Sequence, residues 1–173
     1  MNPLKEPQKI PNLDLSIGFS WYAVIKIGKQ KRNGRKVVFE AAQTNSLVRV
    51  TLGLDSQNSF CIWIRDSEGK KVSSEPLSSD LFLNKFVLLS AEVIPEDQLQ
   101  VLLRAGVNNE FSTNKQVQLS VGAPGPARFS LGASVDEKDH AAFELAELML
   151  YSSTQSEEEK AKLRKYVRER FGF

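Results

Sequence analysis

Arginine and tryptophan occur at alternate positions of two segments that are typical of neighbouring strands. Because strand side chains alternate between the two faces of a sheet, Arg49, Trp63 and Arg65 are predicted to share one face. Aromatic rings stack on sugar rings, and guanidinium groups form paired hydrogen bonds with carboxylates. The pattern therefore predicts a surface that binds a carbohydrate or a protein.

Two further side chains, Tyr22 and Lys26, are expected on this face because they alternate with apolar residues of an earlier segment. The opposite face is expected to form the core, with Val48, Val50, Leu52, Phe60, Ile62 and Ile64. An alternative is that Trp63 packs under the terminal helix or a loop, since large aromatic side chains are usually well buried. At the level of sequence, both interpretations of Trp63 stay open.

A second candidate region is the segment KIGKQKRNGRK at 26–36, which holds six of the 23 Lys and Arg residues. Asn33-Gly34 supplies the positive-φ residues of a tight turn, so a basic hairpin is predicted, with Lys29, Lys31, Arg32, Arg35 and Lys36. Such a cluster attracts sulfated glycans, phospholipid headgroups or nucleic acid, and a solvated hairpin without a partner fits equally well. Nucleic acid is not expected, because two nearby aromatic residues are too few to stack successive bases.

No pair of carboxylates suits glycoside hydrolysis, which needs two acidic groups facing one cleft. Glu144 and Glu147 are the best candidates, but they differ by three positions and would point to opposite faces of a regular strand. Glu40 stands alone at a strand end. The single cysteine, Cys61, is far in sequence from the single histidine, His140, that a thiol nucleophile would need. We therefore predict no catalytic residue, and a buried, inert Cys61.

A calcium site would need several carboxylate and carbonyl oxygens. Asp136, Glu137 and Asp139 could supply them if their loop met Asp55 or Asp66. Their spacing matches no defined calcium-binding loop, and solvated loop acids are the more ordinary interpretation. We predict no metal ligand and no cofactor, with calcium kept as an alternative that no motif supports.

The chain has 173 residues, of which 41% are hydrophobic and 25% are charged, and its formal net charge is +2. These values are typical of one soluble globular domain that needs no disulfide or metal to fold. Residues 1–18 carry three of the seven prolines and are predicted to be an extended surface leader before a domain over 19–173. No signal-peptide pattern and no apolar run of membrane-spanning length are present. The sequence alone assigns no compartment.

About ten segments rich in β-branched and aromatic residues are separated by turn signals, at roughly the 8- to 12-residue spacing of antiparallel sandwiches. The predicted strands cover 19–27, 37–41, 46–55, 59–66, 69–77, 85–94, 99–106, 116–122, 129–134 and 143–152. Only the C-terminal segment has helical periodicity. Ser156 and Glu159 match a capping box, which predicts a helix over 156–170 that breaks at Gly172. Its apolar stripe is Leu163, Tyr166, Val167 and Phe171.

The order of these elements resembles the laminin-G-like domains of the concanavalin A-like lectin/glucanase superfamily. FSWYAVIKI is similar to an early strand of such domains, and LVRVTLGLDSQNSFCIWIRDSEGKKVSSEPL to the next hairpin. The most specific part is the ending, in which the strand FELAELMLY precedes a capped helix that finishes in aromatic-Gly-aromatic. A Trp-His pair typical of relatives is missing from NKFVLLSAEV, and Asn108-Asn109 replaces an Asn-Gly turn.

This resemblance covers 19–173 and implies a two-sheet antiparallel jelly roll with a helix against its edge, often found outside cells or at their surface. We predict a non-catalytic, lectin-like module that binds a carbohydrate, in particular an anionic glycan, through the Trp63 face or the basic hairpin. A protein–protein interaction or structural module of a larger assembly is the alternative. A glycoside hydrolase or polysaccharide lyase is the least favoured interpretation.

Overall fold

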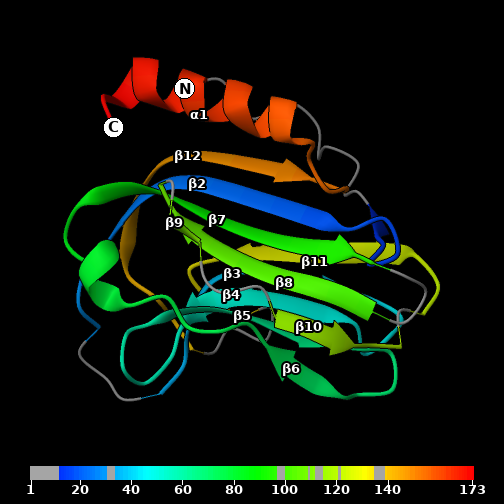
Figure 1. The fold of residues 1–173 in the computed structure, drawn as a ribbon. Helices are drawn as coiled ribbons and strands as arrows, with labels where there is room; N and C mark the ends of the chain where they lie inside the picture. The colour runs from blue at the N-terminus through cyan, green and yellow to red at the C-terminus, as the bar shows by residue number, and fades with distance from the viewer. Residues whose placement is uncertain are drawn as a thin grey trace, which may run out of the picture.

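The computed structural model describes residues 12–30, 34–96, 100–108, 110–111, 115–120, 122–134 and 139–173. Two antiparallel sheets are stacked on each other (Figure 1). Across the first sheet the strands are β1 (Asn12–Leu13), β11 (Gly125–Leu131), β3 (Lys36–Gln43), β4 (Arg49–Leu54), β5 (Phe60–Arg65) and β6 (Lys71–Ser73). Across the second they are β10 (Lys115–Gln118), β8 (Gln100–Val107), β7 (Phe86–Pro95), β2 (Phe19–Ile27) and β12 (Phe143–Tyr151), with β9 (Glu110–Phe111) beside β8.

The helices of the described part are η1 (Ser79–Leu81), a short 3-10 helix before β7, and α1 (Glu157–Phe171), which follows β12. The prediction of an all-β, two-sheet antiparallel jelly-roll sandwich with one C-terminal α-helix is confirmed. The core lies between the sheets, where the ring centroid of Trp21 is 6.2 Å from those of Phe39 and Phe60. All the residues of the third and fourth predicted strands that were expected to face inward are buried.

The segment between β2 and β3 is not a hairpin. β2 pairs with β7 and β12, whereas β3 pairs with β4 and β11, so the connection crosses from one sheet to the other. Turn signals are local, but the sheet that a strand joins depends on partners far away in the chain. Gly34 has a φ of +105°, and Lys31, Arg32 and Asn33 lie outside the described residues.

The predicted surface leader also needs correction. Residues 12–13 form β1, which pairs with Pro126 and Gly125 at the start of β11. Leu13 and Leu15 are both buried in the core. Residues 125–127, which lie between the predicted strands 116–122 and 129–134, therefore form the start of β11, while residues 1–11 lie outside the described part.

The capping box of α1 is present as predicted. The backbone N–H and the hydroxyl of Ser156 donate to Glu159 Oε2 at 2.8 and 2.7 Å, and the Glu159 N–H donates back to Ser156 Oγ at 3.3 Å. Gly172 adopts the left-handed conformation, with φ +82°, and its N–H donates to the carbonyl of Arg168. Both ends of the helix are therefore capped by the residues from which the sequence analysis predicted them.

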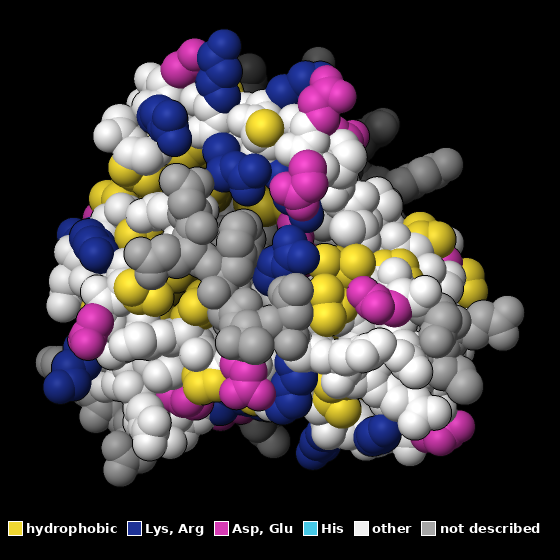
Figure 2. All heavy atoms as spheres, in the orientation of Figure 1, with side chains coloured by type: hydrophobic (Ala, Val, Ile, Leu, Met, Phe, Trp, Pro, Cys, Tyr) yellow, Lys and Arg dark blue, Asp and Glu magenta, His cyan; other side chains and the backbone are white. Residues whose placement is uncertain are grey.

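The helix covers the outer face of the second sheet, above β12, β2 and β7 (Figure 1). Leu163 and Val167 pack on Tyr22, Val24 and Leu88. The solvent face of α1 carries Lys and Arg side chains interleaved with Glu (Figure 2).

Tyr166 does not belong to the buried stripe, because it is 38% exposed and its hydroxyl donates to Glu147 Oε1 at 2.8 Å.

A buried charged cluster lies under α1 at the position where the helix presents Lys160 to the sheet. Lys160 Nζ is 3.0 Å from Glu92 Oε1 and 3.0 Å from Glu157 Oε1, and only 5% of its side chain is exposed. The Tyr22 hydroxyl donates to Glu92 Oε1 at 2.6 Å, and Arg104 NH1 is 3.5 Å from Glu92 Oε2. Burial and the neighbouring Glu92 raise the pKa of Tyr22, so the phenol stays protonated and keeps donating.

Removing Glu92 is predicted to release the helix. Glu92→Gln removes the buried carboxylate of the cluster and leaves the Lys160 ammonium with the exposed Glu157 alone, so we expect a loss of about 3–5 kcal/mol in the free energy of unfolding. The measurement is urea denaturation followed by circular dichroism. The double variant Glu92→Leu/Lys160→Met should recover most of this loss, and Lys162→Met, with a side chain 73% exposed, should change stability little. A Glu92→Gln protein as stable as the parent would contradict this role.

The first turn of α1 is predicted to weaken in acid. The Ser156 hydroxyl and then its N–H lower the pKa of Glu159, and the hydrogen bond from Lys160 lowers that of Glu157. A carboxylate with a depressed folded-state pKa stabilises the fold above its unfolded pKa of about 4.3, and this contribution is lost as the pH falls through the lower folded value. Thermal unfolding between pH 3 and 7 should therefore show a smaller acid loss for Glu159→Gln than for the parent.

Candidate ligand-binding site

The outer face of the first sheet brings together polar side chains from three central strands and from β6. Glu40, Thr51 and Trp63 lie directly opposite one another across β3, β4 and β5. In the neighbouring row, Arg49 lies opposite Arg65 and Arg65 opposite Lys71, across β4, β5 and β6. Directly opposite residues of an antiparallel pair share a face, so these two rows form one surface.

A pocket of about 130 Å³ opens on this surface. Its polar and aromatic lining consists of Arg35, Arg49, Thr51, Trp63, Arg65 and Lys71. Trp63 is half-buried, as are Arg49 and Arg65, while Lys71 is exposed. The structure therefore brings Trp63, Arg49 and Arg65 together, as the alternation of residues predicted.

Arg35 connects the pocket to the basic segment between β2 and β3. Its guanidinium carbon lies over the Trp63 ring, 5.5 Å from the centroid, and its NH2 group is 3.6 Å from Asp139 Oδ2. Lys29 is exposed and Lys36 is half-buried, whereas Lys31 and Arg32 lie outside the described residues. Thus one residue of the predicted basic hairpin joins the Trp63 site, which the sequence could not show.

A buried carboxylate supports the floor of the pocket. Glu40 is fully buried, and its Oε2 accepts a hydrogen bond of 2.8 Å from the Thr51 hydroxyl. Its Oε1 is 3.3 Å from Arg49 NH1. This arrangement holds the Arg49 side chain over the sheet and compensates part of its charge. Glu40, predicted to be isolated, is therefore a structural partner of the cationic site.

Tyr22 and Lys26 do not belong to this surface. Both lie on β2 in the second sheet, where Tyr22 is buried under α1 and Lys26 Nζ pairs with Glu144 Oε1 at 2.9 Å. The prediction that they join the Trp63 face is wrong because alternation shows which residues of one strand share a face, but not which sheet that strand joins. The alternative burial of Trp63 beneath the terminal helix is wrong for the same reason, since α1 covers the other sheet.

The separation of Glu144 and Glu147 onto opposite faces is also wrong. A bulge between Leu145 and Glu147 places an extra residue in β12, so Glu144 lies opposite Lys26 and Glu147 opposite Val24. Both carboxylates therefore point to the outer face of the second sheet. Glu144 pairs with Lys26 there, and Glu147 accepts the hydrogen bond from α1.

Acidic loop residues in the described part have structural roles. Asp66 Oδ1 accepts from the backbone N–H groups of Glu68 and Lys70, and Asp55 Oδ1 accepts from Gln57 and Ser59. Among the described residues, no group of three or more His, Cys, Asp or Glu side chains could hold a metal ion. Asp136 and Glu137 lie outside these residues.

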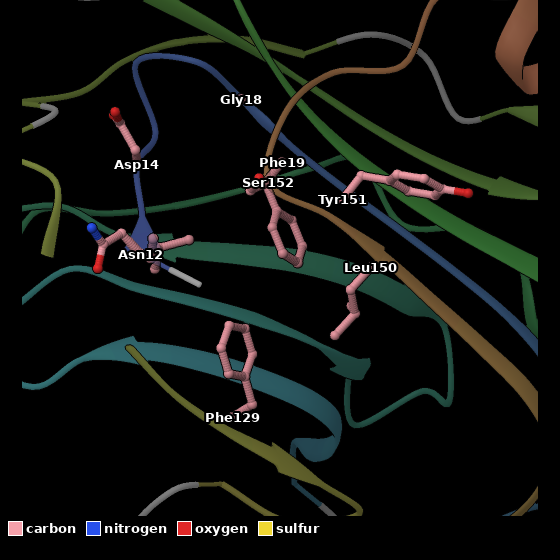
Figure 3. A pocket seen from close by; sticks show the side chains of 9 residues that line it. Asn12, Asp14, Gly18, Phe19, Phe129, Leu150, Tyr151 and Ser152 are labelled. Atoms are coloured by element: carbon pink, nitrogen blue, oxygen red, sulfur yellow. The ribbon is translucent and has the colours of Figure 1, made fainter. Parts of the chain in front are cut away.

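A second hollow, of about 190 Å³, opens where β11 and β12 meet β1 at the side of the sandwich (Figure 3). Phe129 and Leu150 approach each other across it, and the Tyr151 ring points away. Its lining is mainly apolar and carries no cationic side chain. This hollow differs in chemistry from the cationic pocket and lies outside the sequence-based prediction.

Comparison with known proteins shows which fold this chain has. No protein family model and no curated protein matches the sequence. Among solved structures, the heptameric SAP-like pentraxin from Limulus polyphemus has a TM-score of 0.56 and 13% identity, over 86% of this chain and 69% of the pentraxin chain. The receptor binding domain of botulinum neurotoxin C/D mosaic serotype has a TM-score of 0.63 and 14% identity, over 88% of this chain. Domains LG4-5 of the mouse laminin α1 chain have a TM-score of 0.54 and 14% identity, again over 88%.

This chain has the concanavalin A-like lectin/glucanase fold. The resemblance inferred from the order of elements and from the C-terminal pattern is confirmed. The concanavalin A-like sandwich of this chain spans 37% of the neurotoxin chain and 47% of the laminin chain. No helix in the described ranges has the length and apolar character needed to cross a lipid bilayer.

Lys71 is the pocket residue that sequence reasoning missed. It lies in the short strand β6, where it is directly opposite Arg65. The segment was predicted as a strand over 69–77, but its register against β5 was not assigned. A hairpin register taken from the turn at Gly69, with φ +85°, would have placed Lys71 opposite Arg65.

Cys61 is predicted to be unreactive in the folded protein. It lies in β5 and is 5% exposed. Burial, and to a smaller extent the nearby Asp55 charge, raises the pKa of its thiol to about 12. Since the thiolate is the reactive form, the thiol should modify slowly at pH 7.5 and at a normal rate in denaturing urea. Alkylation rates with iodoacetamide, measured by mass spectrometry, test this. Fast modification of the native protein would contradict the burial of Cys61.

Proposed function

We propose that this protein is a non-catalytic binding module for anionic glycans, with its site at the Trp63 pocket. The observation that carries the proposal is the meeting of an indole ring with four cationic side chains, Arg35, Arg49, Arg65 and Lys71, in one pocket. An aromatic ring supplies a face for a sugar ring, and cations supply donors for a carboxylate or sulfate. The pocket thus combines the two chemistries that recognise an acidic sugar.

Charge balance favours an anionic ligand over a neutral one. Arg35 pairs with Asp139, and Arg49 pairs with Glu40. Among the described residues, the Arg65 guanidinium and the Lys71 ammonium have no hydrogen-bond or ion-pair partner. A ligand carboxylate or sulfate would supply the missing negative charge, and binding should weaken with salt because these cations are partly exposed.

The fold neighbours are consistent with this class of ligand. A botulinum neurotoxin DC binding domain is described in complex with SialylT, and cell entry of neurotoxin type C is described as dependent on two ganglioside molecules. These statements concern those proteins, whose identity to this chain is 11% and 12%. They support a glycan as the ligand class for the fold, and the site assignment depends on the Trp63 pocket alone.

The position of Arg35 sets a condition on how a sugar would bind. Its guanidinium already lies over the Trp63 ring, so a stacked sugar has to replace it or lie beside it. The Arg35 side chain is 42% exposed and lies 3.6 Å from Asp139, a partly exposed ion pair of the kind that contributes about 0.2–1 kcal/mol. Arg35 can therefore move from the ring to the anionic group of the ligand at small cost.

A glycan array at two salt concentrations tests the proposal, followed by titration of Trp fluorescence with the sugars that bind. We expect sulfated or uronic sugars to bind and to be released by salt. Trp63→Ala and Arg65→Ser should each weaken binding about tenfold, through lost stacking and lost charge-assisted hydrogen bonds. Arg168→Ser on the solvent face of α1 is the matched control and should leave binding unchanged.

An array on which no acidic sugar binds would overturn the proposal, provided that circular dichroism shows a folded protein. Equal loss of binding in Arg168→Ser and Arg65→Ser would also overturn it, because attraction would then follow net charge rather than the pocket.

Protein–protein interaction is the second candidate, and two exposed leucines of β12, one of which lines the second hollow, favour it. Leu145 and Leu150 on β12 are 39% and 37% exposed, and β12 is an edge strand of its sheet. Exposed apolar side chains on a sheet edge are typical of contact surfaces.

Light scattering distinguishes glycan binding from protein–protein interaction. A stable oligomer that Leu150→Ser dissociates, together with a glycan array on which nothing binds, supports protein–protein interaction.

A further inference from the structure

The cations of the Trp63 site continue as a row that runs across the first sheet from β11 to β6. Arg128 on β11 lies opposite Ala42 on β3, and Ala42 lies opposite Arg49 on β4. Arg49, Arg65 and Lys71 continue the row across β4, β5 and β6. Since strands are about 4.8 Å apart, the row spans about 19 Å from β11 to β6. We call Arg128, Arg49, Arg65 and Lys71, with Ala42 between the first two, the cationic row.

The side chains of the cationic row share one face of the first sheet. Directly opposite residues of antiparallel strands project to the same side, so register alone aligns the five positions. Arg128 and Lys71 at its two ends are exposed, whereas the small side chain of Ala42, between Arg128 and Arg49, is buried. Trp63 lies beside the row, on the same face and two residues along β5 from Arg65.

Like charges meet in this row without acidic residues between them. Arg49 faces Arg65, and Arg65 faces Lys71, which is an unfavourable arrangement for directly opposite residues of a sheet. Glu40 compensates Arg49, but among the described residues the charged groups of Arg65, Lys71 and Arg128 have no ion-pair partner. Three of the four cations of the row, Arg128, Arg65 and Lys71, are therefore uncompensated among the described residues, and a negatively charged chain would neutralise them.

We propose that the cationic row binds an internal stretch of a linear acidic polysaccharide, which lies across the strands and contacts the row with several successive anionic sugars. This inference rests on the proposed function and specifies the ligand as a polymer rather than a terminal sugar. A single sugar at the Trp63 pocket reaches Arg49, Arg65 and Lys71, whereas Arg128 is two strands, or about 10 Å, beyond Arg49. A contribution of Arg128 to affinity therefore distinguishes a polymer bound along the row from a terminal sugar bound at the Trp63 pocket.

A polysaccharide fits the row better than a nucleic acid. Single-stranded nucleic acids stack successive bases on several aromatic side chains along a groove. Along the cationic row, the described part of the chain presents the single aromatic ring of Trp63. One ring and a line of cations suit a chain with one stacked sugar and repeated carboxylate or sulfate groups.

Size-defined heparin oligosaccharides test the inference by isothermal titration at 50 and 300 mM NaCl. We expect a decasaccharide to bind at least tenfold more tightly than a disaccharide at low salt. Arg128→Ser should weaken the decasaccharide about three- to fivefold, the upper range for one exposed ion pair, and leave the disaccharide unchanged. Arg168→Ser, which makes the same change on α1, should affect neither.

Lys71→Thr provides a second readout that separates binding from structural support. If Lys71 had a structural role, its replacement would lower the melting temperature of the free protein. If it is one of three cations that repel one another, its replacement should leave that melting temperature equal or higher. The same variant should bind the decasaccharide more weakly and show a smaller rise in melting temperature when it is added.

The outcomes distinguish the inference from the proposed function. If the disaccharide binds at Trp63 and Arg128→Ser leaves the decasaccharide unaffected, the polymer mode is wrong and the pocket assignment stands. If no oligosaccharide of any length binds, both are wrong. If single-stranded DNA of equal charge competes as well as the decasaccharide, the row is a general polyanion surface and the inference of a polysaccharide ligand is overturned.

Discussion

The buried contact between Lys160 and Glu92 decides how the molecule divides into a covered face and an open one. It joins the helix to the centre of the second sheet, and Tyr22 and Arg104 complete the coordination of the carboxylate. Desolvated charges are stable only when their partners are in place, so this cluster accepts the helix in one position and register. Leu163 and Val167 then cover the apolar outer face of β2 and β7. No helix in the described part of the chain covers the outer face of the first sheet, where the cationic pocket lies.

Charge is balanced on the outer face of the second sheet and unbalanced on that of the first. Under the helix, Glu92 satisfies Lys160, Arg104 and the Tyr22 hydroxyl, and the result is a rigid attachment. On the open face, Glu40 pairs with Arg49 and Asp139 with Arg35, and among the described residues positive charge remains in excess. Repulsion among side chains that the fold itself places opposite one another is unfavourable in the free protein. An anionic ligand would relieve it, which is why the open face is assigned to binding.

Local signals in the sequence predicted the elements well. β2 and the predicted first strand have the same bounds, and α1 begins and ends within one residue of the predicted helix. The helix caps involve only residues close in sequence: Ser156 with Glu159 at the start, and the left-handed Gly172 with Arg168 at the end. Alternation on β4 and β5 likewise depends on neighbours in the same hairpin, so the shared face of Arg49, Trp63 and Arg65 could be predicted. The bulge in β12 could not, because its extra residue shows only in the register against β2.

The sequence by itself determined the strands, the helix, the inward residues of the sandwich and the core of the cationic site, because periodicity and capping are local chemistry. Only the tertiary structure decided which sheet each strand joined. It therefore decided that Tyr22 and Lys26 lie on the far sheet, that Arg35 lies over Trp63, and that Lys71 and Arg128 extend the row. These placements depend on the pairing of segments distant in the chain, and the free energy of such pairing comes from burial across the two sheets rather than from any one segment.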